Sequence, residues 1–206
     1  MGQKVNPKSI RLKINETWKS SWFGNKGDYA VKLISDLQIR KLLEVKLKEA
    51  SVSNIIINRD SNKVTIDIYS GRPGVIIGRG GAGSDQLKKE LTKFVKGRIQ
   101  INILEVKKPD CDAAIIAEGV AIQIEKRIPF RRAIKQAVEK AKEAGVSGIK
   151  VMVSGRLNGA DIARSEKASF GTVPLSTFKN VIDYKAVTSK TTFGIIGVKV
   201  WIYKDK

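Results

Sequence analysis

The sequence predicts an α+β fold in two halves, and three observations lead to this prediction. Segments with apolar residues at helical spacing are followed by shorter segments of strand-like alternation. The first half reads helix, strand, strand, glycine-rich loop, helix and strand, whereas the second reads two helices followed by strands. A Lys-Lys-Pro break at residues 107–109 separates the halves. A length of 206 residues accommodates two small domains of this class.

The first half contains clear strand and helix patterns. In its second strand, Val64, Ile66 and Ile68 alternate with polar residues, which is the period of a half-buried strand. The three polar residues before this strand favour a hairpin. Ser84 is placed to cap the second helix and Gly97 to end it. The expected helices and strands cover, in order, residues 29–50, 52–59, 63–70, 84–96 and 98–106.

The second half begins with two helices and continues with strand-like segments. Pro129 opens the second of these helices and Gly145 ends it. In the last segment Val198, Val200 and Ile202 alternate with polar or aromatic residues, so we expect an antiparallel sheet. The helices cover 110–126 and 129–144, and the strand-like segments cover 149–156, 172–178, 181–187 and 194–204. The predicted divisions are a basic arm (1–16), a first domain (17–108) and a C-terminal α+β domain (109–206).

The composition indicates a binding protein rather than an enzyme. The chain has 39 Lys and Arg against 20 Asp and Glu, a net charge of +19, which favours a polyanionic partner. Nucleic acid is the first candidate and an anionic membrane surface is the second. There is no histidine and Cys111 stands alone, which removes the commonest general base, the usual zinc ligands and any internal disulfide. We expect no cofactor, no metal and no catalytic residue.

The same features bear on location. The first fourteen residues lack an apolar run of signal-peptide length, and the apolar runs elsewhere are too short to cross a bilayer. A single thiol suits a reducing compartment. We expect a soluble intracellular protein without a membrane partner.

The glycine-rich stretch GRPGVIIGRGGAGS, residues 71–84, allows two interpretations. Residues 78–83 fit G-x-G-x-x-G, the fingerprint of dinucleotide-binding domains. The same stretch contains G-x-x-G from Gly78 to Gly81, the loop with which KH domains clamp a nucleic-acid backbone. A Walker phosphate loop is excluded, because Ser and Asp follow the last glycine where Lys and Ser or Thr are required.

The context of this loop favours the backbone clamp. A dinucleotide site needs a strand directly before the loop, but only the short apolar helical turn 75–77 lies there, and Pro73 interrupts what precedes it. Glycines allow a sugar-phosphate backbone to approach the peptide N–H groups, and the next helix directs its positive end to the same place. The alternative is a glycine-rich turn without a ligand. The residues expected to bind RNA are Gly78, Arg79, Gly80 and Gly81.

A second basic cluster lies on the expected helix 129–144. Arg131 and Lys135 are four residues apart and Arg132 lies about 100° round the helix, so all three share its outer side. No acid follows them before Glu139, which makes a solvated face of balanced charges a weaker alternative. Membrane binding would need an exposed apolar face, and here the apolar residues are expected to pack on the strands. We call Arg131, Arg132 and Lys135 the basic ridge.

Three aromatic residues interrupt the polar N-terminal region. Trp18, Trp22 and Phe23 could stack on bases or could dock this region on the body of the protein. We favour docking, because clustered aromatic side chains usually bury against apolar surface.

Several long segments resemble one known family. The chain is similar, over essentially its whole length, to bacterial small-subunit ribosomal protein number three, the KH-containing protein of the ribosomal head. The order of the first half matches the type II KH topology, α-β-β-α-α-β. The chain departs from the family at Ser84, where an apolar residue is usual, and at residues 165–172, which lack a usual aromatic pair. The segments that carry the resemblance are MGQKVNPKSIRL, GRPGVIIGRGG, IPFRRAIKQAV, VSGRLNGADIAR, VPLSTF, IDY and TTFGIIGVKVWIYK.

The resemblance implies a structural constituent of the small ribosomal subunit, without a cofactor. Such a protein binds rRNA in the head and mRNA where mRNA enters the subunit, and the basic ridge would help to open structured mRNA. The implied neighbours are the tenth and fourteenth small-subunit proteins, and the fourth and fifth near the mRNA. We expect it in cytoplasmic ribosomes, with an organellar ribosome left open. Further rRNA contacts are expected from Lys4, Lys8, Arg11, Lys126, Arg127, Arg156 and Arg164.

Two other functions stay open at this point. One is a free KH-domain regulator of mRNA, which would not remain with small subunits at high salt. The other is a lyase acting on abasic DNA through a lysine amine, although the sequence marks no lysine with a special pocket.

Overall fold

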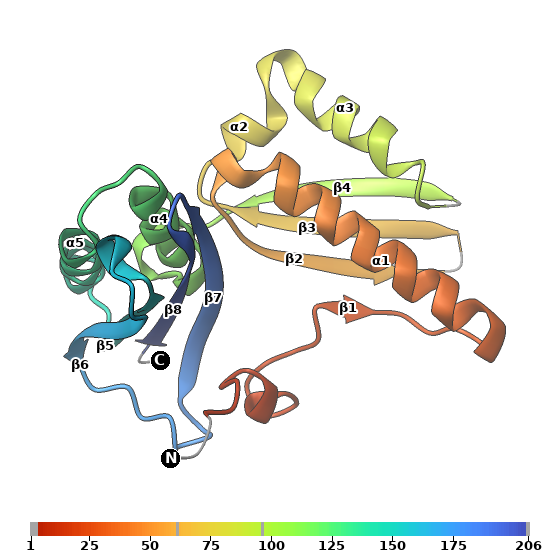
Figure 1. Ribbon diagram of the computed structural model, residues 1–206. Helices are drawn as coiled ribbons and strands as arrows, with labels where there is room; N and C mark the ends of the chain where they lie inside the picture. The colour runs from red at the N-terminus through yellow and green to blue at the C-terminus, as the bar shows by residue number, and fades with distance from the viewer. Residues whose placement is uncertain (1–3, 61, 96, 205–206) are drawn as a thin grey trace. The chain divides into compact units, whose positions relative to one another are not determined.

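The chain forms two compact units (Figure 1). The computed structural model describes residues 4–60, 62–95 and 97–204. One unit is Trp18–Lys107, and the other combines residues 108–204 with the N-terminal residues 4–17. We call them the N-terminal unit and the C-terminal unit. Both are mixtures of helices and strands, which confirms the α+β prediction.

The N-terminal unit has the predicted order of elements, with one short strand added. Strand β2 pairs antiparallel with β3, as the hairpin prediction requires, and β3 pairs parallel with β4. The added strand β1 pairs parallel with β2 at the sheet edge, so the order is β1-β2-β3-β4. The elements are β1 Ser20–Ser21, α1 Lys26–Lys46, β2 Val52–Arg59, β3 Lys63–Ser70, α2 Pro73–Ile77, α3 Ala82–Leu91 and β4 Arg98–Glu105.

One face of this sheet carries the core of the N-terminal unit. The strand register places Ile57, Ile66 and Ile101 side by side on that face. Helix α1 contributes Leu43 and helix α3 contributes Leu91 to the same buried cluster, so both helices cover the same face. The alternation seen in β3 therefore arises because one set of side chains lies against helices and the other does not.

The aromatic residues near the start of this unit behave differently from one another. Trp22 docks as expected: its Nε1 donates to Asp36 Oδ2 at 2.8 Å, and its ring lies 5.2 Å from that of Tyr29. Phe23 is 86% exposed and Trp18 is 60% exposed. The docking prediction is therefore correct for Trp22 and wrong for its two neighbours.

The C-terminal unit is a four-stranded antiparallel sheet with two helices on one face (Figure 1). The strand order is β6-β5-β8-β7. Val151, Val153, Val198 and Val200 form adjacent cross-strand pairs in its core, against apolar residues of both helices. The elements are α4 Ala113–Glu125, α5 Phe130–Glu143, β5 Gly148–Gly155, β6 Arg164–Gly171, β7 Val181–Thr191 and β8 Gly194–Lys204.

One predicted strand is absent from this sheet and another takes its place. Residues 172–178 are an irregular segment, and the carbonyl oxygens of Leu175 and Thr177 accept hydrogen bonds from the Arg11 guanidinium rather than from a strand. Strand β6 instead pairs with β5 along the sheet edge. Its sequence, RSEKASFG, has only Ala168 and Phe170 as apolar side chains, which is too little apolar alternation to predict a strand.

Helix ends also differ from the predictions. Helix α1 begins at Lys26 and ends at Lys46, and α3 begins at Ala82 with Gly81 as its N-cap. Ser84 lies inside α3 and does not cap it. Asp112 caps α4, accepting from the Ala114 N–H at 2.9 Å. Short 3₁₀ helices cover Ser9–Arg11, Lys48–Ala50, Arg79–Gly81, Pro109–Cys111 and Leu157–Gly159.

Candidate nucleic-acid interface

The glycine loop between α2 and α3 has a shape that favours glycine. Gly78, Gly80 and Gly81 have φ values of 68°, 61° and 84°, in the left-handed region. Gly83 lacks a side chain for another reason, because a Cβ there would lie 2.6 Å from the carbonyl oxygen of Ile76. A Cβ on Gly80 would meet nothing within 4 Å, so the backbone at Gly80 is open to a ligand.

The surroundings of this loop rule out the dinucleotide hypothesis. Helix α2, rather than a strand, leads into the loop, and it contains Pro73 at its first turn. Arg79 is exposed beside Gly80. The loop thus combines open backbone with a free-standing cation, which suits a phosphate better than a buried pyrophosphate.

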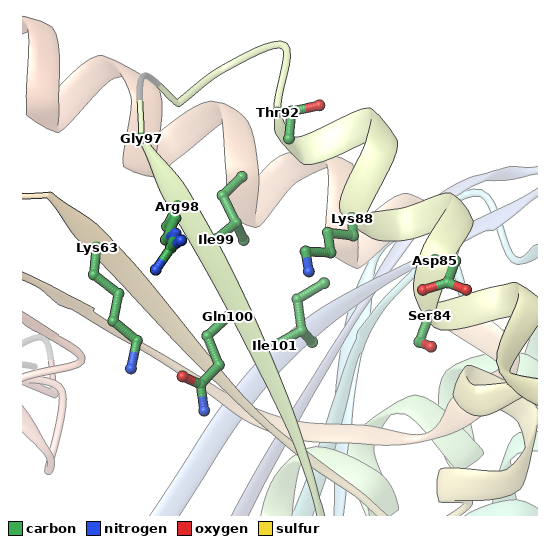
Figure 2. A pocket seen from close by; sticks show the side chains of 10 residues that line it. All are labelled: Lys63, Ser84, Asp85, Lys88, Thr92, Gly97, Arg98, Ile99, Gln100 and Ile101. Carbon is green, nitrogen blue, oxygen red and sulfur yellow. The ribbon is translucent and has the colours of Figure 1, made fainter.

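A groove continues from the loop along α3 and β4. It has a volume of about 700 Å³ and is lined by Lys63, Ser84, Asp85, Lys88, Thr92, Gly97, Arg98, Ile99, Gln100 and Ile101. Figure 2 shows Lys88 on α3 opposite the side chains of Lys63, Arg98 and Gln100 on the strands. Among the described residues, three cations and one acid line this groove, so its charge suits an anionic ligand.

Ser84 links the loop to the groove. Its Oγ donates to the carbonyl oxygen of Gly81 at 2.8 Å, and the residue is half-buried. The hydroxyl therefore braces the loop from within α3, while the residue also lines the groove. A ligand strand lying in the groove would reach the glycine loop without crossing another element.

The basic ridge lies on α5, and its orientation follows the predicted helix face. Arg131, Arg132 and Lys135 are exposed, whereas the buried side consists of apolar residues. The helix packs on β5 and β6, which makes it a rigid support for the three cations.

The ridge has an acidic partner that the prediction did not include. Glu166 on β6 accepts hydrogen bonds from Nε and Nη2 of Arg131 at 3.2 and 3.1 Å. The hydrogen bond from Arg131 is the main reason that the pKa of Glu166 lies below its usual value, and Glu166 in turn raises the pKa of Arg131. Among the residues that the structure describes, Arg132 and Lys135 have no ion-pair partner.

Two cations of the N-terminal arm prove to be structural. Arg11 is fully buried and donates to the carbonyl oxygens of Pro7, Leu175, Thr177 and Asn180 at 2.9 to 3.1 Å. The expectation that Arg11 contacts rRNA is not supported, because its donors are used within the protein and no part of it is accessible.

Lys8 also takes part in the contacts that hold the N-terminal arm on the C-terminal unit. Its Nζ lies 2.7 Å from Asp183 Oδ1. Burial acts to lower the pKa of Lys8, but the attraction and hydrogen bond to Asp183 outweigh burial and raise that pKa. Lys8 therefore holds the arm on β7, and only part of its side chain is available to a ligand.

The other predicted contacts are dispersed over the C-terminal unit. Lys4 and Lys126 are exposed. Arg127, with a left-handed φ of 62°, and Arg156 line a pocket of about 280 Å³ that also includes Phe193. Arg156 pairs with Asp161 at 3.2 Å, and Arg164 lies 3.8 Å from Glu166.

The groove residues Lys63, Lys88 and Arg98 were missed by the sequence analysis. They come from two strands and a helix, and no spacing in the chain joins them. The indication in the sequence was the expected order of elements after the glycine loop, a helix followed by a strand. This order places the helix beside that strand at the edge of the sheet.

The residues that the structure describes contain no group of three or more His, Cys, Asp or Glu side chains placed to hold a metal ion. No helix within them is long and apolar enough to cross a membrane.

Both units contain residues that match known protein families. Residues 38–111 match the KH domain, and residues 120–202 match ribosomal protein S3, C-terminal domain. The glycine loop, its groove and this fold define a KH-domain protein. Among curated relatives, small ribosomal subunit protein uS3 of Shewanella loihica is 52% identical over the whole chain and 90% of the relative. The proteins of that name from Enterococcus faecalis and Legionella pneumophila are 52% and 53% identical over the whole chain and 94% of each relative.

The chain belongs to the uS3 family of small ribosomal subunit proteins. It is thus a structural ribosomal protein and not an enzyme, which confirms the resemblance and removes the lyase alternative.

Proposed function

We propose that this chain binds rRNA in the head of the small subunit and mRNA where it enters the subunit, and that it assists the opening of structured mRNA. The observation that carries the proposal is the continuity of the glycine loop with the cationic groove between α3 and β4. A single strand of RNA in this groove would place phosphates beside Lys63, Lys88 and Arg98. The open backbone at Gly80 would then clamp the strand at its end.

The mode of binding follows from the side chains present. Phosphates supply most contacts in such complexes, and they carry no sequence information. The described residues that line the groove include three cations but no aromatic ring. Backbone recognition rather than base stacking is therefore the main source of affinity, and the strand would be held largely without regard to sequence.

The basic ridge has a separate role in this proposal. Arg132 and Lys135 are exposed and have no acidic partner among the residues that the structure describes, so they can bind phosphates of mRNA. Arg131, by contrast, is hydrogen-bonded to Glu166. Separated mRNA strands that are held on the rigid helix α5 reanneal less readily. The energy that separates the strands comes from translocation of the ribosome. The other exposed cations, including Lys126 and Arg127, extend this basic surface towards rRNA.

Protein neighbours are part of the same proposal. The outward face of α1 exposes Val31, Ile34, Leu37 and Val45, which are 55 to 69% accessible. These residues lie within one side of the helix, and an exposed apolar face of this kind marks a protein contact. We assign it to the tenth and fourteenth small-subunit proteins of the head, and place the fourth and fifth near the mRNA. The proposed location of the protein is the cytoplasmic ribosome.

The test of RNA binding uses the double substitution Arg79→Asp with Gly80→Asp. Asp tolerates the left-handed backbone of position 80 better than most residues, so the fold measured by circular dichroism should be unchanged. Two carboxylates at the clamp should weaken binding of single-stranded RNA at least about tenfold. Wild-type log affinity should fall with log salt by about 0.7 to 0.9 per phosphate contacted.

The control for this test is Lys41→Asp with Lys48→Gln, which changes the net charge equally. Both lysines are exposed, and neither belongs to the glycine loop or to the lining of the groove. Equal weakening by the two double variants would mean that total charge rather than the loop sets affinity. A flat salt dependence, or micromolar binding of NAD or FAD to the wild type, would contradict the proposal itself.

A further inference from the structure

The sheet of the C-terminal unit has a second face whose side chains differ from those on the helix side. Three contacts identify the helix side: Glu166 reaches Arg131 of α5, Asp183 accepts from the Ala113 N–H of α4, and Ser189 donates to the Ala121 carbonyl. Side chains alternate along a strand, so the residues between these positions point the other way. The strand register then fixes which of them are neighbours.

The neighbours on this open face are mainly lysines and small residues. Met152 on β5 is flanked by Lys167 on β6 and Lys199 on β8, and Lys199 is paired with Ala186 on β7. The adjacent row contains Ser169, Lys150, Trp201 and Tyr184. Lys167 and Lys199 are exposed, and Lys150 is half-buried. We call Lys150, Lys167 and Lys199 the lysine face.

The four strands distribute charge unequally between their two sides. Their only acidic residues are Glu166 and Asp183, and both belong to the helix side, where each is paired with a cation. The open side has no acid on any of these strands, all of which the structure describes in full. The lysine face is therefore uncompensated within the sheet.

The lysines of this face are close enough to repel one another. Burial lowers the pKa of Lys150, and the nearby Lys4 and Lys167 lower it further. Lys150 Nζ is held 5.6 Å from the centre of the Trp201 ring, which lies 5.3 Å from the ring of Tyr184. The aromatic pair thus fixes one ammonium group in place among like charges. Such an arrangement costs free energy that a bound polyanion would offset.

We propose that the lysine face is a further RNA-binding surface, which takes the sugar-phosphate backbone of an RNA segment different from those on the groove and the ridge. This inference rests on the proposed RNA-binding function. The ridge belongs to a helix on the other side of the same sheet, so the unit can contact two RNA segments at once. Lys167 and Lys199 lie two strand spacings apart, roughly 10 Å, and can bind separate phosphates of one segment.

The small residues on this face support a nucleic-acid partner over an acidic protein. Ser154, Ser165 and Ser169 offer hydroxyl groups suited to phosphate oxygens, and Gly197 permits a close approach. Trp201 is 5% exposed, so the aromatic pair presents little apolar surface for a protein core to cover.

The first test compares Lys167→Gln with Lys199→Gln in the full chain against the control Lys41→Gln with Lys48→Gln. Binding of a single-stranded oligouridine is measured over a range of salt. Loss of two phosphate contacts with a single strand should reduce the slope of log affinity against log salt by about 1.4, and the control should keep the wild-type slope. An unchanged slope in the Lys167, Lys199 variant would overturn the inference.

The second test uses the wild-type protein and needs no substitution. Lysines are acetylated with and without bound oligouridine, and the sites are read by mass spectrometry. Lys150, Lys167 and Lys199 should be protected by RNA, while Lys41 and Lys48 stay reactive. Protection by polyglutamate but not by RNA would replace the inference with an acidic protein partner. Failure of the wild type to bind RNA would instead overturn the proposed function, so the two failures are distinguishable.

Discussion

The N-terminal arm and helix α5 both carry basic side chains, but the two regions use them in opposite ways. Arg11 of the arm is buried and its guanidinium donates four hydrogen bonds to backbone carbonyls. Arg132 and Lys135 of α5 are exposed and have no ion-pair partner in the part of the chain that the structure describes. A cation is available to a ligand only where the fold leaves its donors unused.

The largest expected effect is on the arm. Arg11→Met should lower the free energy of unfolding of the C-terminal unit by about 3 kcal/mol, because four carbonyl oxygens lose a charged donor in a buried site. Hydrogen exchange of the β5 and β8 amides measures this unit separately. The matched control, Arg132→Met, should change stability by less than about 0.5 kcal/mol. Similar losses in both variants would remove the contrast between arm and ridge.

A smaller effect concerns the anchor of the arm and its pH dependence. Burial acts to raise the pKa of Asp183, but Lys8, the Ala113 N–H and Lys204 outweigh burial and lower that pKa. The stabilisation is therefore complete above the ordinary Asp pKa of about 3.9 and is lost as pH falls through the lower, folded-state value. Asp183→Asn should reduce stability by about 1 to 2 kcal/mol at neutral pH and flatten this acid dependence.

The control for the anchor is Asp161→Asn, since the Asp161 side chain is 99% exposed. Acid unfolding curves of the two variants give the comparison. If the Asp161 variant flattened the acid dependence as much as the Asp183 variant, the anchor would not be the cause.

The ridge should show a change in function with little change in stability. Replacing Arg131, Arg132 and Lys135 by Ala keeps the helix, because Ala is the best helix former. Subunits should still assemble, and unstructured messages should be translated nearly normally. Messages with a stable hairpin ahead of the decoding site should be translated about fivefold more slowly, a difference of about 1 kcal/mol in activation free energy.

The measurement for the ridge compares a hairpin message with a matched open one on the same ribosomes. Equal slowing on both would make the ridge a general rRNA anchor. No slowing on either would leave it as a solvated helix face.

The smallest expected effect tests whether Glu166 limits the ridge. Glu166→Gln removes the acid that occupies Arg131 while preserving the side-chain shape. With Arg131 released, the salt slope for RNA binding should rise by up to about 0.7 to 0.9, the contribution of one phosphate contact. Asp161→Asn serves again as the control. A lower slope in the Glu166 variant would show that the pair positions Arg131 for RNA rather than competing with it.

The N-terminal unit was largely predictable because its signals are local. Val64, Ile66 and Ile68 face the core as their alternation indicates, and the hairpin and the helix after the loop are present. Helix ends were less predictable. Ser84 matched a cap pattern, but left-handed Gly81 already begins the helix, which leaves the serine hydroxyl to bind the Gly81 carbonyl.

The C-terminal sheet was predicted less well because its edge is polar. Strand β6 has exposed residues on both sides, so only its pairing with β5 makes it a strand. Residues 172–178 have strand-like composition, yet Arg11 binds two of their carbonyl oxygens and Pro174 lacks an N–H for a ladder. Pairing between distant segments, rather than propensity, decided both cases.

The sequence by itself determined the features that depend on near neighbours: the α+β class, the order of elements in the N-terminal unit, the glycine loop and the outward direction of the ridge. The periodicities of helices and strands extend over only a few residues, so they are visible directly in the sequence. Only the tertiary structure decided which cations are free. Arg11 meets Asn180, 169 positions away, Arg131 meets Glu166, 35 positions away, and the lysine face is assembled from separate strands. Such contacts depend on how the chain packs, because burial and charge pairing act through space and not along the sequence.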